Sequence, residues 1–145
     1  MAYSDLQGFL RDLEQVGQLH RIKVEVDPEL EITEIVRRVI SEDGPALLFE
    51  RVKGSRYPLA INILGNMKRI EMGLGRHPSE IGRDLVRTLE KLKSPSPKAL
   101  FEARGHLWQL LAARTVTKLG TAPIQQVIEA PDLSALPIIK CWPED

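Results

Sequence analysis

The stretch LHRIKVEVDPELEITEIVRRVISEDGPALLFE, residues 19–50, carries in one run the signals of a strand, a helix and a second strand. Residues 19–26 alternate apolar and charged side chains, which predicts a half-buried strand. Residues 31–42 place isoleucine and valine at helical spacing, and a Gly-Pro pair then ends the helix. Residues 46–50 form a short apolar run, which is typical of a buried strand.

Helices and a further strand flank this stretch. A first helix begins at Ser4, which has capping-box spacing with Gln7, and it ends near Gly17. A strand over 57–64 should form a hairpin or near-hairpin with the strand before it. A short helix follows, and a longer one covers 79–93. The order predicts an α+β fold with a small mixed or antiparallel sheet packed with helices, but not the strand order.

The last third of the chain has a different composition. Residues 94–98, SPSPK, indicate a linker, and a helical stretch follows it. Four prolines exclude a long helix after residue 120, although residues 125–129 could form a strand. We therefore expect an α+β domain over residues 1–120, which includes the helical linker, and an extended proline-rich C-terminal arm over residues 121–145.

Composition and charge narrow the function classes. Twenty basic and twenty acidic side chains cancel and are mixed along the chain, so no charge draws it to nucleic acid or an anionic membrane. The longest apolar runs are far shorter than the roughly 20 residues that span a bilayer. The N-terminus lacks the pattern of a signal peptide. Cys141 is the only cysteine and can form no internal disulfide, which fits a cytoplasmic location.

Few residues are candidates for catalysis or metal binding. His20, His77 and His106 share no metal-ligand spacing. His20 falls on the polar side of its strand, so we expect a solvated surface histidine. Cys141 has no neighbouring histidine or helix N-terminus that would activate its thiol. We therefore favour a buried, inert thiol over a nucleophile.

Two further stretches have structural explanations. The glycine-rich MGLGRHPSE, residues 72–80, could cradle a phosphate, but it lacks the full GxGxxG pattern and follows a predicted helix. We favour a helix–loop–helix corner there. Glu29, Glu31 and Glu34 cluster at a helix start, where the helix dipole favours negative charge. Composition and spacing alone therefore show no catalytic, cofactor-binding or metal-binding residue.

Several short motifs occur in a fixed order along the chain. They are G-x-L-x-R-I at 17–22, V-D-P at 26–28, G-P-A-L-L-F-E at 44–50, K-G at 53–54, Pro58, Asn62 with Gly65, and P-I-I-K-C-W-P-E-D at 137–145. In this order and spacing they closely resemble the N-terminal part of UbiD-family decarboxylases. The resemblance covers nearly the whole chain, and residues 94–118 are its least specific part.

The resemblance implies an enzyme larger than this chain. Enzymes like these reversibly decarboxylate aromatic or α,β-unsaturated carboxylic acids, some in ubiquinone biosynthesis. They use prenylated flavin mononucleotide with a divalent metal such as manganese or magnesium and a potassium ion, and an arginine and two glutamates shuttle a proton. The family's flavin-binding, metal and catalytic regions lie beyond the last motif, so whether this chain is itself an enzyme stays open.

Two hypotheses follow from the sequence. The chain is the N-terminal domain of such a decarboxylase, non-catalytic on its own, which packs against the remaining domains of an enzyme that forms a homo-oligomer. The alternative is a stand-alone interaction module or subunit that docks through its C-terminal arm. In the isolated chain we expect residues 120–145 to be mobile or to pack on another molecule, and Trp108 and Trp142 to pack on neighbours in the complete protein.

Overall fold

The structure is a computed structural model that describes residues 3–93 and 120–144, together with positions 104, 105, 108, 115 and 117. The chain divides into two compact units. The first unit combines residues 1–77 with residues 131–145, and the second contains residues 78–130. Most of the predicted helical linker, 94–118, lies outside the described residues. None of the helices described is long and apolar enough to cross a membrane.

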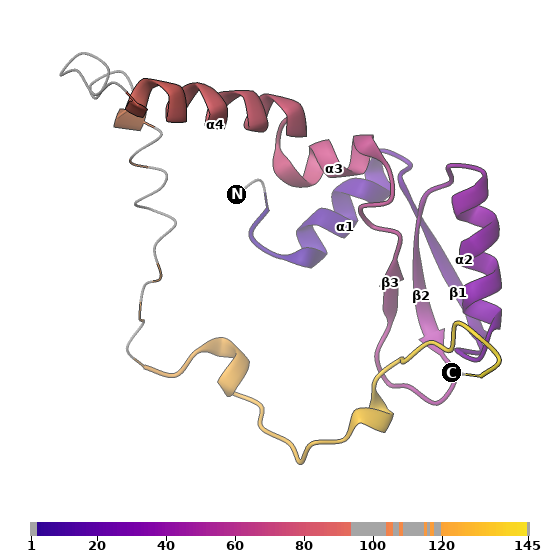
Figure 1. Ribbon diagram of the computed structural model, residues 1–145. Helices are drawn as coiled ribbons and strands as arrows, with labels where there is room; N and C mark the ends of the chain where they lie inside the picture. The colour runs from indigo at the N-terminus through magenta and orange to yellow at the C-terminus, as the bar shows by residue number, and fades with distance from the viewer. Residues whose placement is uncertain are drawn as a thin grey trace. The chain divides into compact units, whose positions relative to one another are not determined.

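A three-stranded mixed sheet forms the centre of the first unit (Figure 1). β1 (Leu19–Val26) pairs in parallel with β2 (Ala46–Val52), and β2 pairs antiparallel with β3 (Leu59–Ile61). The helix α2 (Glu31–Ser41) connects β1 to β2, as a parallel pair requires. The α+β class and the hairpin between β2 and β3 are therefore confirmed.

Successive residues of β2 face opposite sides of the sheet, and a helix covers each side. The helix α1 (Leu6–Gln15) covers one face through the cluster Phe9, Leu10, Leu13, Leu19, Ala46 and Leu48. The helix α2 covers the other through the cluster Val26, Ile32, Val36, Leu47, Phe49 and Val52. The helix α3 (Met67–Leu74) lies next to α1, because its Met72 packs against the first cluster. Both clusters draw on β2, so this strand lies at the centre of the core.

The N-terminus of α1 differs from the prediction. The N-cap is Asp5 rather than Ser4, because the Asp5 carboxylate accepts the Gly8 N–H at 2.7 Å. The Ser4 hydroxyl donates to the same carboxylate at 3.0 Å. The bond from Gly8 and the bond from Ser4 hold the pKa of Asp5 below its ordinary value. The carboxylate therefore also places negative charge at the positive end of the helix dipole.

The predicted bounds of β1 are correct, but its alternation is interrupted. The pairing register with β2 shifts between Ile22 and Glu25, as in a β-bulge. Ile22 and Val26 pack in the core under α2, whereas Val24 is 68% exposed. The expectation that Val24 faces inward is therefore wrong, because the extra residue at the bulge breaks the two-residue period.

The two remaining strand predictions need correction. The strand predicted over 57–64 is limited to β3 at the edge of the sheet, because Asn62 has a φ of 60° and turns the chain. The Asn62 side chain stabilises that turn by donating to the carbonyl oxygen of Pro45 at 3.2 Å. The segment predicted as a strand over 125–129 contains the end of a 3₁₀ helix (η1, Pro123–Gln125) and irregular chain.

A buried arginine joins α3 to two loops of the first unit. The side chain of Arg69, in α3, donates through Nη1 to the carbonyl oxygen of Gly44 at 3.1 Å and to Gln18 Oε1 at 3.3 Å. Its Nε is buried and has no hydrogen-bond partner among the residues that the structure describes. Burial lowers the pKa of the guanidinium, which remains charged. Gly44 tolerates no side chain, since a Cβ would lie 2.7 Å from Val39 Cγ1.

In the second unit, the helix α4 (Pro78–Lys93) matches the predicted helix over 79–93. Leu85 and Leu89, four residues apart on this helix, are both exposed. Thr88 is buried, and its hydroxyl donates to the Asp84 carbonyl oxygen at 2.7 Å within the helix. The helix α4 therefore has apolar side chains that are exposed on its surface.

The packing of α1 on the sheet can be tested with two leucines of the same helix. Leu13 is completely buried, whereas Leu6 is 53% exposed. Leu13→Ala should lower the free energy of unfolding by about 2–5 kcal/mol, because it leaves a cavity in the core. Leu6→Ala should lower it by less than about 1 kcal/mol. Urea denaturation measures both values, and equal losses would contradict this packing.

Candidate functional site

The C-terminal part of the chain folds back onto the first unit, where we call residues 131–144 the docked segment (yellow in Figure 1). Ile139 packs against the cluster under α2, and the Ser55 hydroxyl donates to the Ala135 carbonyl oxygen at 2.8 Å. We expected residues 120–145 to be mobile or to pack on another molecule. The structure instead places the docked segment on the chain's own sheet unit, because Ile139 finds an apolar site there.

Lys140 anchors the docked segment at the start of α2. Its N–H donates to the Pro28 carbonyl oxygen at 3.0 Å. Its carbonyl oxygen accepts the Leu30 N–H at 3.3 Å and the Thr33 hydroxyl at 3.0 Å. Because Leu30 has a φ of 63° and provides no side-chain cap, the docked segment satisfies an N–H that the helix terminus leaves unpaired.

A pocket lies where the docked segment meets α2, and we call it the seam pocket. It has a volume of about 640 Å³ and is lined by Leu30, Thr33, Glu34, Arg37, Cys141 and Trp142. Cys141 is exposed, so the expectation of a buried thiol is wrong. The residue of this segment that packs against the core is Ile139, which is partly buried. Trp142 is 71% exposed and offers a large apolar surface at the pocket.

The charged side chains at the seam pocket are already paired. Arg37 donates to both carboxylate oxygens of Glu34 at 2.8 and 2.9 Å, and Arg38 donates to one of them at 2.8 Å. These hydrogen bonds lower the pKa of Glu34 to about 2. Glu34 is therefore ionised near neutral pH and is poorly suited to proton transfer.

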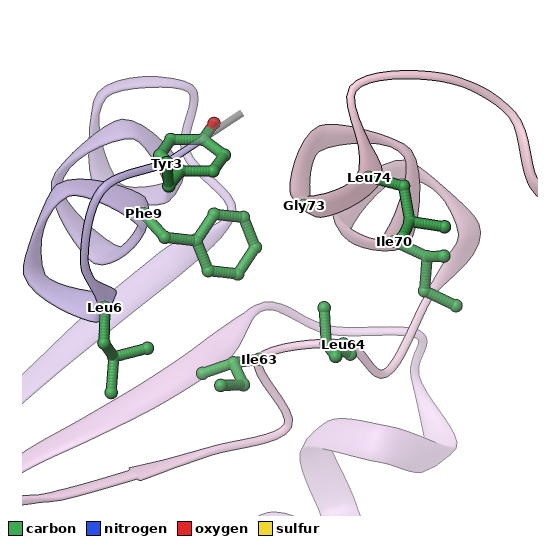
Figure 2. A pocket seen from close by; sticks show the side chains of 8 residues that line it. All are labelled: Tyr3, Leu6, Phe9, Ile63, Leu64, Ile70, Gly73 and Leu74. Atoms are coloured by element: carbon green, nitrogen blue, oxygen red, sulfur yellow. The ribbon is translucent and has the colours of Figure 1, made fainter. Parts of the chain in front are cut away.

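The second hollow is an apolar groove between α1, α3 and the chain after β3, which we call the α1–α3 groove (Figure 2). It has a volume of about 580 Å³ and is lined by Tyr3, Leu6, Phe9, Ile63, Leu64, Ile70, Gly73 and Leu74. The Tyr3 and Phe9 rings pack together with centroids 4.9 Å apart. Figure 2 shows these rings on one side of the groove and Ile70 and Leu74 on the other. The groove is thus a preformed apolar surface.

Neither hollow fits a flavin mononucleotide. A flavin phosphate needs several N–H or cationic donors, and the side chains lining the α1–α3 groove offer only the Tyr3 hydroxyl. In the seam pocket, Arg37 is paired with Glu34 and the Thr33 hydroxyl donates to Lys140. Among the described residues, no group of three or more His, Cys, Asp and Glu side chains could hold a metal ion.

The two histidines in the described part of the chain belong to no group that could hold a metal ion. His20 is exposed on β1, as expected. His77 lies with its Nε2 3.5 Å from Glu71 Oε1, and His106 lies outside the described residues. In the glycine-rich stretch, Gly75 has a φ of 77° and caps the C-terminus of α3. The predicted helix–loop–helix is confirmed, because this stretch links the end of α3 to the start of α4 at Pro78.

A family comparison identifies the class of the protein. The family model described as the 3-octaprenyl-4-hydroxybenzoate carboxy-lyase N-terminal domain, UbiD_N, matches residues 10–89, which is more than half of the chain. The matched residues include the second half of α1, all of α2 and α3, and the complete sheet. The chain therefore belongs to the UbiD family, and it contains the N-terminal domain of that family.

Solved structures of UbiD-class decarboxylases are similar to the chain. Vanillic acid decarboxylase of Sedimentibacter hydroxybenzoicus (ShVdcCD), in an open form with truncated ShVdcD, is 35% identical over 59% of this chain and 20% of that chain, with a TM-score of 0.51. An evolved dimeric form of the UbiD-class enzyme HmfF from Pelotomaculum thermopropionicum, in complex with prFMN, is 27% identical over 66% of this chain and 21% of that chain, with a TM-score of 0.49. The matched region spans about a fifth of the length of these structures.

Reasoning from the sequence missed both hollows. Leu6 and Phe9 lie on one face of α1, and Ile70 and Leu74 lie on one face of α3. Helical spacing in the sequence therefore predicts each of the two apolar faces that line the groove. The spacing does not predict that α1 and α3 lie next to each other, because this depends on the tertiary structure. Thr33 and Lys140 are 107 residues apart, and a single threonine on a helix gives no indication of such a contact.

The anchor of the docked segment can be tested with Thr33→Val, which removes the hydrogen bond to Lys140 and nearly preserves the side-chain shape. The loss of one hydrogen bond, about 0.5–1.5 kcal/mol, should accelerate amide exchange at Lys140 about 2- to 13-fold. Hydrogen–deuterium exchange measures this rate. Thr88→Val, which removes a hydroxyl bond inside α4, is the control and should leave it unchanged. An unchanged rate in Thr33→Val would contradict the anchor.

The charge network of Glu34 predicts a pH dependence. The pKa of Glu34 falls from an ordinary value of 4.5 to about 2, so its contribution to stability is present above pH 4.5. The contribution is lost as the pH falls towards about 2, because the unfolded chain takes up the proton first. Across this window the parent protein should lose more stability than Glu34→Gln does.

Urea denaturation at several pH values between about 2 and 5 measures that difference. The double variant Arg37→Gln/Arg38→Gln is the matched control, because it keeps Glu34 and removes both partners. It should show the same shallow pH dependence as Glu34→Gln. A parent slope no steeper than that of either variant would contradict the assignment.

Proposed function

We propose that this chain is the N-terminal, non-catalytic domain of a UbiD-type carboxy-lyase. The complete enzyme would catalyse the reversible, non-oxidative decarboxylation of an aromatic or α,β-unsaturated carboxylic acid. The family match over residues 10–89 is the observation that carries this proposal. The 35% identity to a vanillic acid decarboxylase supports an aromatic acid as the substrate class.

The cofactor in this proposal is prenylated flavin mononucleotide, bound by the part of the enzyme that follows this domain. Similar structures of HmfF are complexes with prFMN or with FMN. A divalent metal, manganese or magnesium, and potassium belong to the same proposed site. The two hollows described above offer no set of donors for a phosphate, so the proposed flavin site is not one of them.

The domain division is also a proposal. Residues 1–120 would form the α+β domain, and residues 121–145 would form the arm that leads to the flavin-binding domain. The contacts of Lys140 support an arm with a fixed exit point, since its carbonyl oxygen and its N–H are both bonded at the start of α2. The complete protein would be a cytoplasmic homo-oligomer, and ubiquinone biosynthesis is one pathway in which such enzymes act.

One observation favours the alternative, a stand-alone module or subunit that docks through its arm. Ile124, Val127 and Ile128 are among the most exposed apolar side chains of the described chain. Such a segment could become ordered on a partner. The docked segment argues against a wholly free arm, because Ile139 is already packed against the first unit. We therefore rank the decarboxylase domain first.

The proposal is tested by comparing the complete reading frame with the 145-residue chain. Both proteins are reconstituted with prenylated flavin mononucleotide and manganese, and bound flavin is measured from its absorbance. Carbon dioxide release is then followed with vanillic acid and other aromatic acids. The complete protein should retain flavin and release carbon dioxide, whereas the 145-residue chain should do neither. Stoichiometric flavin on the short chain, or a reading frame that ends at Asp145, would refute the proposal.

A further inference from the structure

The α1–α3 groove has the properties of an interaction surface. Phe9 is buried at its base, whereas Leu6, Leu64 and Leu74 are each more than half exposed around it. Contiguous exposed apolar surface of this kind costs solubility unless another molecule or domain covers it. The groove is held by packed elements, since Phe9 and Tyr3 contact each other and Phe9 belongs to the core cluster.

The chemistry of the groove favours a protein segment over a small molecule. Small-molecule sites combine apolar walls with several placed polar groups that fix the ligand's orientation. Among the side chains that line this groove, only Tyr3 carries a polar group, as Figure 2 shows by its single oxygen atom. Apolar side chains entering from a neighbouring segment need no such groups.

The same chemistry favours a permanent partner. Obligate interfaces resemble a hydrophobic core cut in half, whereas transient interfaces are more polar. The groove contains no charged side chain at all among its lining residues. A partner synthesised with the domain and never released from it fits this composition best.

The similar structures indicate where that partner would come from. The matched region covers only about a fifth of the length of the UbiD-class enzymes, so most of such an enzyme lies outside this domain. We propose that the α1–α3 groove binds an uncharged, apolar segment of the remaining polypeptide of the same enzyme. This inference rests on the proposed function and names the surface through which the domain docks.

Gly73 lines the groove, and a side chain added there provides a selective way to fill it. A Cβ at Gly73 would lie 3.5 Å from Leu64 Cδ2 and 3.6 Å from Phe9 Cζ, which are ordinary contact distances. Gly73 also lies inside α3, where a larger residue has a better helix propensity. Gly73→Leu should therefore leave the domain folded and occupy the space that the partner segment needs.

The experiment uses the complete enzyme with the photo-crosslinking residue p-benzoylphenylalanine at position 6 or at position 74. After irradiation, mass spectrometry should locate crosslinks from both positions to one apolar segment beyond Asp145. The same residue at position 24, which is exposed on β1, is the control and should not reach that segment. Gly73→Leu should reduce the crosslink yield about tenfold or more, and Gly73→Ala should largely preserve it.

The outcomes separate this inference from the proposed function. Crosslinks between the grooves of two copies of the enzyme would overturn the inference, and so would the absence of crosslinks to the remaining polypeptide. Either result would do so even if the enzyme binds flavin and releases carbon dioxide. An unchanged yield in Gly73→Leu, with an unchanged circular dichroism spectrum, would also overturn it. A reading frame that ends at Asp145 would remove both proposals.

Discussion

The fold of the first unit depends on the burial of β2 from both sides. Ala46 and Leu48 face α1, and Leu47 and Phe49 face α2, so each helix packs on a different set of side chains from the same strand. A strand without a polar face can be stable only between two layers. This requirement places α1 and α2 on opposite faces of the sheet, and it explains why the neighbouring strands can be partly exposed.

Polar contacts then determine how the loops close around this core. Arg69 binds the turn after α1 and the loop after α2 through a single nitrogen, and Lys140 binds the start of α2. These contacts involve few atoms, but each satisfies backbone or side-chain groups that the apolar layers cannot satisfy. The apolar clusters thus set the layers, and the buried cation and the β-bridge at Glu29 and Lys140 set the connections.

The distribution of charged and apolar side chains around the two hollows indicates what kind of function the domain can have. Glu34 and Arg37, which line the seam pocket, are paired with each other, and the α1–α3 groove is lined by apolar side chains and the Tyr3 ring. Such a surface suits packing against protein, which agrees with the role that we propose for this domain in a larger enzyme.

The sequence by itself determined the elements whose periodicity is local. The alternation in residues 19–26 and the helical spacing in residues 31–42 predicted β1 and α2, and the fixed order of short motifs indicated the family. Only the tertiary structure determined the bulge that exposes Val24, the shortening of β3 at Asn62 and the exposure of Cys141. The position of the docked segment and the presence of the α1–α3 groove were likewise determined only by the tertiary structure. Each of these depends on contacts between residues far apart in the chain, and such contacts leave no periodic trace in the residues that make them.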